Sequence, residues 1–168
     1  MKTLYLVRHA KSSWDFPELT DIDRPLNKRG QRNAPEMGER LAKKGILPDL
    51  MLTSPAKRAI DTCREIAGKI GYPAEKIVVN KKIYHAYTLE LLDIVSAQPN
   101  DINSLMLFGH NPGFTGFANK LCHVDIHNIP TSGIFCCTFD VETWEDVDFN
   151  GGEFVFFDYP KKEQNGQL

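Results

Sequence analysis

The sequence has no apolar run that approaches the roughly 20 residues of a membrane-spanning helix. Its first residues, MKTLYLVRHAKSS, have too short an apolar stretch and no small-residue cleavage site for a secretory signal. The formal net charge is only −2, so the chain lacks the general basic face that nucleic acids and acidic membranes attract. We therefore expect a cytoplasmic protein that binds neither nucleic acid nor membrane, and whose anion sites are local.

Cysteines are few, and they lack the C-x-x-C spacing of many zinc and redox sites. The sequence contains Cys63, Cys122, Cys136 and Cys137. We expect all of them to be free thiols. Cys122 suggests a metal site together with His123 and His127, but Cys and His near a helix end are more often packing residues. We therefore predict no metal.

Linkers are missing as well. No internal repeat, low-complexity tract or Pro/Gly/Ser-rich stretch precedes the polar segment 161–168. A chain of 168 residues fits one ordinary domain. The sequence predicts a single domain over residues 1–160, followed by a flexible C-terminal tail over residues 161–168.

Short apolar runs rich in β-forming residues alternate with segments of helical periodicity. The runs cover residues 3–7, 50–53, 77–79 and 105–108, and the helical segments cover residues 31–44 and 54–70 and begin again at Thr88 and near Gly113. This alternation predicts a three-layer α/β sandwich with a mostly parallel sheet. Residues 134–141 and 153–159, joined across Asn150-Gly151-Gly152, are predicted as a late antiparallel pair.

The second helix has clear start and stop signals. Ser54 followed by Pro55 predicts an N-cap and a first helical residue. Gly71 predicts a left-handed end to the same helix.

Three of the predicted strands end in residues that suit a phosphate group. The first ends in Arg8-His9, the second leads through Ser54 to Arg58, and the fourth is followed by His110. Ligands of open α/β sheets bind at the carboxyl ends of the strands, so these side chains are expected to converge. Taken singly, each is more often a rim, helix-surface or turn residue. The prediction of a phosphate pocket depends on their joint occurrence.

The residue types fit a phosphoryl-transfer role. Guanidinium groups match phosphate oxygens bidentately and stay charged, which suits Arg8 and Arg58. A neutral His9 attacks phosphorus if its other ring nitrogen donates to a backbone carbonyl. A protonated His110 would offer a further donor to the oxygens that gain charge in the transition state.

The stretches LYLVRHAKSS, TSPAKRAIDT and MLFGHNPG resemble, in this order, the signatures of the histidine phosphatase superfamily, which has the phosphoglycerate-mutase-like fold. DRPLNKRGQ and IYHAYTLELL are similar to its short SixA-type phosphohistidine phosphatase branch. The resemblance implies that His9 is the phosphorylated nucleophile, that Arg8 and Arg58 hold the phosphoryl group and that His110 completes the pocket. It implies a hydrolase that needs no metal and no cofactor.

One departure from the family bears on the substrate. Many mutases and phosphomonoesterases of the superfamily resemble one another in having a glutamate acid after the third strand, where this chain reads Tyr84-His85-Ala86. A positioned acid matters most for an alkoxide leaving group and much less for an imidazole. We therefore expect protein phosphohistidine as the substrate. His85 and Asp15 are the candidates for a proton donor, although a plain loop or surface role is favoured for each.

Two alternatives remain open at this point. One is a phosphatase for small phosphate esters, and the less favoured one is a phosphate-binding interaction module without turnover. The expected partner is a phosphorylated protein or a small phosphate ester, and the oligomeric state is left open. Trp14, Phe16, Pro130 and Thr131 would contact a protein partner around an open pocket, although core anchoring is favoured for Trp14 and Phe16.

Overall fold

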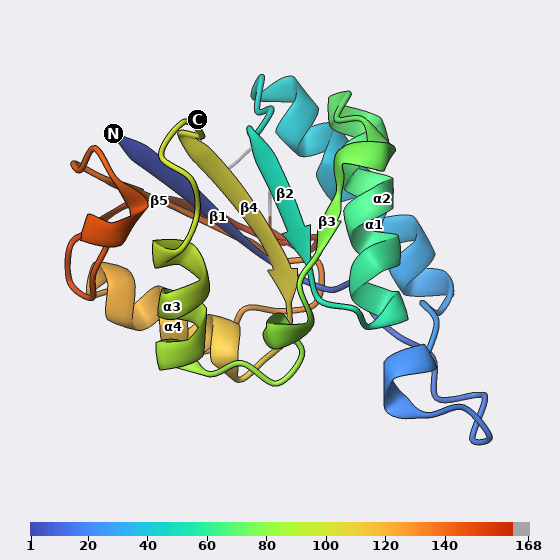
Figure 1. Cartoon of the computed structure of the whole chain (residues 1–168). Helices are drawn as coiled ribbons and strands as arrows, with labels where there is room; N and C mark the ends of the chain where they lie inside the picture. Colours follow the sequence, from blue (N-terminus) through green and yellow to red (C-terminus); the bar gives the residue numbers. More distant parts are fainter. Residues whose placement is uncertain (163–168) are drawn as a thin grey trace.

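The computed structural model describes residues 1–162. In this range a six-stranded sheet lies between two layers of helices (Figure 1). The strands are β1 (Lys2–Arg8), β2 (Leu50–Thr53), β3 (Val78–Val79), β4 (Ser104–Gly109), β5 (Ile134–Phe139) and β6 (Gly152–Asp158). The helices are α1 (Lys28–Lys43), α2 (Lys57–Ile70), α3 (Thr88–Ser96) and α4 (Gly113–Cys122), with 3-10 turns η1 (Asp21–Asp23), η2 (Ala74–Lys76), η3 (Lys81–Ile83) and η4 (Trp144–Asp146).

The strand order is β3-β2-β4-β1-β5-β6. The first four strands along the chain are parallel, whereas β5 runs antiparallel to both β1 and β6. This confirms the predicted α/β sandwich with its late antiparallel pair. Because β2, β4 and β1 are neighbours that point the same way, the residues that follow them meet at one edge of the sheet.

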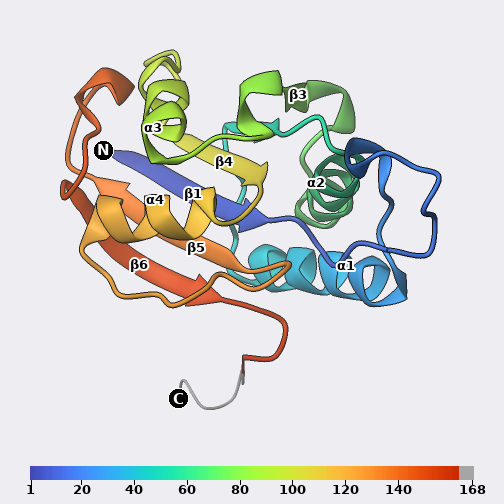
Figure 2. The same ribbon diagram turned by 90° about the horizontal axis from the view of Figure 1, so that it is seen from below.

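The two faces of the sheet bury alternate residues of each strand. On β4, Leu105 and Leu107 pack with α3 and α4, whereas Met106 and Phe108 pack with α1 and α2. In Figure 2, α3 and α4 lie together at the left of the view and α1 and α2 lie together at the right. The continuous apolar runs of the parallel strands follow from burial on both faces.

The start of α2 differs from its prediction. The helix begins at Lys57, with Ala56 as the N-cap residue, so the expected cap at Ser54 is wrong. The chain stays extended there because the Ser54 N–H still donates to the Phe108 carbonyl of β4. At the other end, Gly71 closes α2 with φ 84°, as predicted.

The loop before α1 lies beyond the helical layers (Figure 1, lower right). Trp14 is 75% exposed and Phe16 is 46% exposed, so their expected role as core anchors is wrong. Instead, the Trp14 ring covers the guanidinium of Arg24, whose Cζ lies 3.3 Å from the ring centroid.

The described chain contains no helix that is long and apolar enough to cross a membrane. Cys63, Cys122, Cys136 and Cys137 are free. The Lys162 side chain donates to the Phe157 carbonyl. The rest of the predicted tail, residues 163–168, lies outside the described residues.

Trp144 provides a test of the core on the α3–α4 side. Its side chain is fully buried, and its indole N–H donates to the Ile102 carbonyl at 2.9 Å. We expect Trp144→Ala to lower the free energy of unfolding by about 3–5 kcal/mol. The exposed Trp14→Ala is the control, and should cost at most about 1 kcal/mol from its lost contact with Arg24. The free energy of unfolding is measured from guanidinium unfolding curves. Equal losses in the Trp144→Ala and Trp14→Ala variants would contradict the core role of Trp144.

Candidate active site

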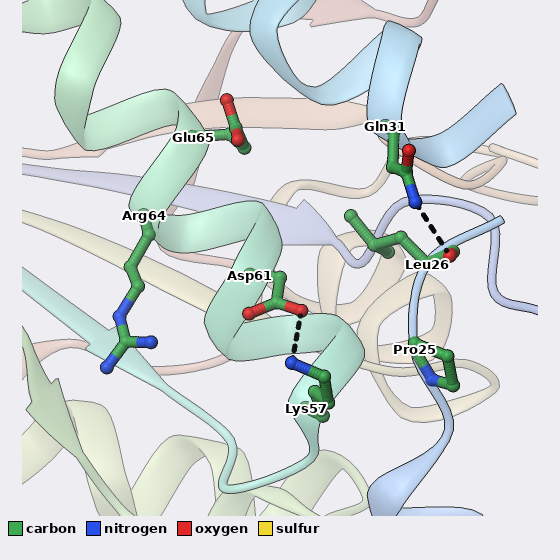
Figure 3. Close-up of a pocket in the computed structure, with 7 residues that line it drawn as sticks. All are labelled: Pro25, Leu26, Gln31, Lys57, Asp61, Arg64 and Glu65. Atoms are coloured by element: carbon green, nitrogen blue, oxygen red, sulfur yellow. Dashed lines mark hydrogen bonds and ion pairs between the residues drawn. The ribbon is translucent and has the colours of Figure 1, made fainter. Parts of the chain in front are cut away.

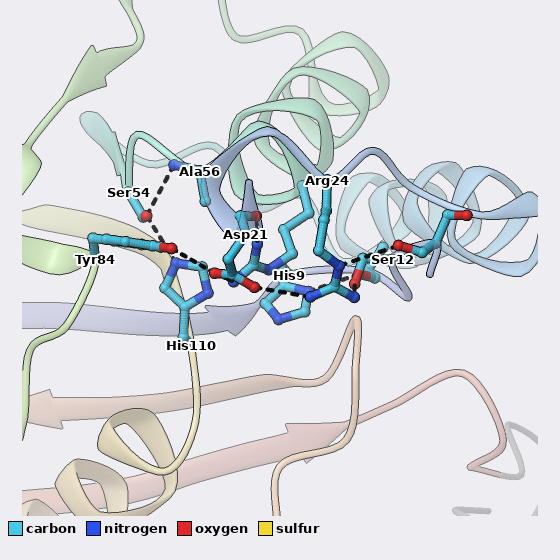
Figure 4. A network of polar contacts seen from close by, with 11 residues as sticks. His9, Ser12, Asp21, Arg24, Ser54, Ala56, Tyr84 and His110 are labelled. Atoms are coloured by element: carbon cyan, nitrogen blue, oxygen red, sulfur yellow. Dashed lines mark hydrogen bonds and ion pairs between the residues drawn. The ribbon is translucent and has the colours of Figure 1, made fainter. Parts of the chain in front are cut away.

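The structure brings the four predicted pocket residues to the same edge of the sheet. Arg8 ends β1 and His9 follows it, while His110 directly follows β4. Arg58 is the second residue of α2, which begins just after β2. The His9 backbone N–H donates to the Gly109 carbonyl at 3.0 Å, and the two imidazole centroids lie 5.2 Å apart. Figure 4 shows the two rings within one polar network.

His9 is held as a neutral imidazole with one free nitrogen. Only 8% of the residue is exposed, and its Nδ1 lies 2.7 Å from the Ala10 carbonyl oxygen. A carbonyl accepts only, so Nδ1 carries the proton and Nε2 keeps its lone pair. Burial lowers the pKa of His9 to about 3, with the nearby positive groups adding to the effect of burial. At neutral pH, Nε2 therefore carries a lone pair and no proton.

Buried polar atoms beside His9 lack a partner among the described residues. These atoms are Arg8 Nε, His110 Nδ1 and Ser132 Oγ. Buried groups of this kind are normally hydrogen-bonded, and leaving them unpaired is costly. The Ser132 backbone N–H donates to the carbonyls of Arg8 and His9, which places this serine at the pocket as well. A tetrahedral oxyanion over His9 would supply acceptors for such donors.

Asp21 brings a carboxylate into the pocket that sequence reasoning did not find. Arg58 donates through Nη1 to the Asp21 carbonyl at 2.7 Å and through Nη2 to its carboxylate at 3.0 Å. Arg24 and Tyr84 also donate to this carboxylate (Figure 4). Asp21 lies just before the family-like stretch DRPLNKRGQ, and nothing in the local pattern links it to Arg58 or Tyr84.

The Asp21 carboxylate is ionised. Partial burial raises its pKa, but the hydrogen bonds from Tyr84, Arg58 and Arg24 together outweigh burial and hold the pKa well below its usual range. Asp21 therefore supplies the negative charge that faces Arg58 while no substrate is present. A phosphoryl group on Arg58 would have to share or replace that contact.

The two candidate proton donors, Asp15 and His85, lie in different places in the structure. Asp15 lines a different hollow, together with Phe16 and Lys28, and its own N–H donates to Ser13 Oγ. His85 lies at the pocket rim, where its ring is 4.0 Å from that of Tyr84. It lines a cavity of 70 Å³ together with Tyr84, Tyr87 and His110. Of the two candidates, only His85 lies beside the histidine pair.

A larger hollow of 360 Å³ lies between α1 and α2 (Figure 3). Lys57 and Asp61 in its wall form an ion pair at 3.1 Å. Its lining includes none of the four predicted pocket residues. We therefore do not assign the candidate active site to this hollow, although it is larger than the 70 Å³ cavity beside His110.

Cys122, His123 and His127 are not gathered into a ligand cluster. Over residues 1–162, no group of three or more His, Cys, Asp or Glu side chains is arranged to hold a metal ion. His123 instead ends α4 in the left-handed conformation, with φ 51°.

Comparisons with known proteins bear on the family and the fold of the chain. The sequence profile of the histidine phosphatase superfamily (branch 1) matches residues 4–79. An uncharacterised chloroplast protein of Arabidopsis thaliana is 32% identical over 133 residues, which are 74% of this chain and 61% of that protein. The putative phosphohistidine phosphatase SixA of Agrobacterium tumefaciens has a similar structure, with a TM-score of 0.76 and 28% identity over 95% of this chain and 98% of the other.

The chain belongs to the histidine phosphatase superfamily. A second structure, the putative SixA of Nakamurella multipartitia, has a TM-score of 0.80 at 23% identity and covers 96% of this chain and 97% of its own. The chain spans only 61% of the length of its Arabidopsis relative. The solved SixA structures, by contrast, match almost end to end, which confirms the fold expected from the resemblance.

The two buried imidazoles predict an acid-sensitive fold. Burial lowers the pKa of His9 to about 3 and that of His110 to about 4, whereas an unfolded histidine titrates near 6.5. Below about pH 6.5 the unfolded chain therefore binds more protons, so the free energy of unfolding falls as the pH drops toward 4. We expect His110→Asn to flatten this slope in urea unfolding measured at several pH values. The exposed His127→Asn should not, and an unchanged slope in the His110 variant would contradict the burial argument.

The negative charge of Asp21 beside Arg58 should weaken the binding of oxyanions in the pocket. Asp21→Asn removes the negative charge beside Arg58 but keeps a side-chain oxygen as acceptor. We expect tungstate to bind several-fold more tightly to this variant in calorimetric titration, because the anion no longer competes with a carboxylate. Asp23→Asn in the same turn is the matched control, since its carboxylate accepts from Thr20. If Asp21→Asn bound tungstate no more tightly than the wild-type protein, competition between the anion and the Asp21 carboxylate would be refuted.

Proposed function

We propose that this protein is a phosphatase that removes the phosphoryl group from phosphohistidine on another protein, through a phosphorylated His9. The observation that carries the proposal is the state of His9. Its Nδ1 proton is tied to the Ala10 carbonyl, so a neutral imidazole presents a free Nε2 beside two arginines and a second histidine. This set provides a nucleophile and fixed positive charge in one place.

The proposed reaction has two steps and needs no group beyond these side chains. His9 Nε2 forms a bond to phosphorus while the bond from phosphorus to the leaving nitrogen breaks. The substrate imidazole, protonated on its other nitrogen, leaves as neutral histidine. Water then attacks phosphorus, the bond to Nε2 breaks, phosphate departs and the surplus proton passes to solvent. Arg8, Arg58 and His110 bind the oxygens in both steps.

The ionised state of Asp21 favours an imidazole leaving group. Asp21 is the carboxylate that the fold brings to Arg58, yet its hydrogen bonds keep it unprotonated at neutral pH. It therefore has no proton to give to an alkoxide, whose departure gains roughly 10²–10⁴ in rate from a positioned acid. Hydrolysis of phosphohistidine depends much less on such an acid, because its leaving group is an imidazole.

The rim of the pocket supports a protein as the source of the phosphohistidine. Tyr87 is 61% exposed beside the 70 Å³ cavity next to His110, and Trp14 and Phe16 are exposed on the loop that leads to Asp21. Exposed aromatic side chains are typical of surfaces that dock other proteins. The near-complete match to two SixA structures, both named as putative phosphohistidine phosphatases, favours the same substrate class.

Rates of turnover on two kinds of substrate test the proposed substrate class. Purified protein would be given a phosphohistidine-bearing protein domain and, separately, a panel of sugar phosphates. We expect faster turnover of the phosphohistidine domain. Faster turnover of the esters would overturn the substrate and favour the small-ester phosphatase, and turnover of neither would favour the binding module.

Rapid quenching tests the nucleophile. We expect the wild-type chain to carry acid-labile, base-stable phosphate after incubation with substrate, and His9→Ala to carry none. His127→Ala, which removes an exposed histidine, is the control and should label normally. Equal labelling of His9→Ala and the wild-type chain would remove His9 from the mechanism.

A further inference from the structure

A buried serine lies directly behind His110. Ser54 follows β2 and is fully buried, and its Oγ is 2.8 Å from His110 Nε2. Because β4 lies between β2 and β1 in the sheet, His110 has Ser54 on one side and His9 on the other. Figure 4 shows this serine joined to both His110 and Ala56. Ser54 thus contacts the His110 ring from the side away from His9.

The hydrogen bonds of Ser54 determine which way its proton points. The Ala56 backbone N–H donates to Ser54 Oγ at 3.2 Å. The hydroxyl has one proton of its own, and within residues 1–162 the acceptor found for it is His110 Nε2. If Nε2 carried a proton instead, Oγ would accept from two N–H groups, and its own buried proton would have no acceptor in the described structure. Buried donors are rarely left in that state.

The proton on His110 then belongs on Nδ1. This atom is buried and has no partner among residues 1–162. With the proton on Nδ1 it is a donor for an anion in the pocket. With the proton on Nε2, a lone pair at Nδ1 would face the oxygens of a bound phosphoryl group and repel them.

The location of this single proton matters because His110 is neutral in the free pocket. Burial lowers its pKa to about 4, and the neighbouring cations add to this. The charged and titratable groups around it are Arg8 and His9 at the end of β1, Asp21 in η1, Arg58 in α2, and Tyr84 and His85 before α3. Asp21 alone among these raises the pKa of His110. A neutral ring has one N–H to offer, so its tautomer decides whether it donates.

We propose that Ser54 is a positioning residue that holds the proton of neutral His110 on Nδ1, so that this nitrogen donates to the phosphoryl oxygens. The inference rests on the proposed function for its choice of ligand. The tautomer itself can be observed without any turnover.

Nitrogen-15 spectroscopy of the histidine rings tests the tautomer. In the wild-type protein near pH 7, we expect the His110 signal to show a protonated Nδ1 and an unprotonated, hydrogen-bonded Nε2. The resonance is assigned by its absence from His110→Asn. A proton on Nε2 in the wild-type spectrum would overturn the proposal, and this measurement requires no variant of Ser54.

Variants of Ser54 test its role. Ser54→Ala should shift His110 toward the Nε2–H tautomer and weaken tungstate binding at least about tenfold, the effect of a lost hydrogen bond to a charged group. Ser54→Thr keeps the hydroxyl and should restore both the tautomer and the affinity. An Ala variant that folds with the wild-type tautomer would refute the role, whatever its stability. Because spectra and tungstate affinity need no substrate, failure here is distinct from failure of the proposed phosphatase activity.

Discussion

A buried concentration of positive charge at the carboxyl edge of the sheet governs the rest of this site. Arg58 is 7% exposed, and Arg8 has a buried Nε without a partner in the described chain. Two guanidinium groups cannot be removed from water at low cost unless an anion faces them. Asp21 supplies that anion to Arg58 in the free protein, and a phosphoryl group would supply it during reaction. The loop that carries Asp21 is thereby tied to the same residue that would bind the substrate.

The same charge and burial keep both histidines neutral, and their separate hydrogen bonds give them different roles. His9 donates through Nδ1 to the Ala10 carbonyl, which leaves the lone pair on Nε2. His110 is contacted at Nε2 by Ser54, which leaves Nδ1 free to donate. In the proposed mechanism, two identical side chains whose ring centroids lie 5.2 Å apart therefore differ in role, because a backbone carbonyl holds one ring and a serine hydroxyl contacts the other.

The positions of these residues follow from sheet topology. β1, β2 and β4 are parallel neighbours, so residues separated by about a hundred positions in the chain emerge side by side. The 128–133 loop borders the pocket, because the Ile129 carbonyl accepts from Arg8 and the Ser132 backbone N–H donates to the His9 carbonyl. The loop before α1, which carries the exposed Trp14, projects beyond the helical layers (Figure 1).

The amino-acid sequence by itself determined the fold class, the family and the side chains at the ends of the parallel strands. These features are local: apolar runs, Gly71 at a helix end, and signature stretches around His9, Arg58 and His110 that need no knowledge of distant contacts. Only the tertiary structure revealed Asp21, which meets Arg58 across 37 residues and Tyr84 across 63. It alone showed that Ser54 contacts His110 rather than capping α2, and that Trp14 is exposed. Each of these depends on which segments the folded sheet brings together, and local sequence patterns carry no information about such long-range neighbours.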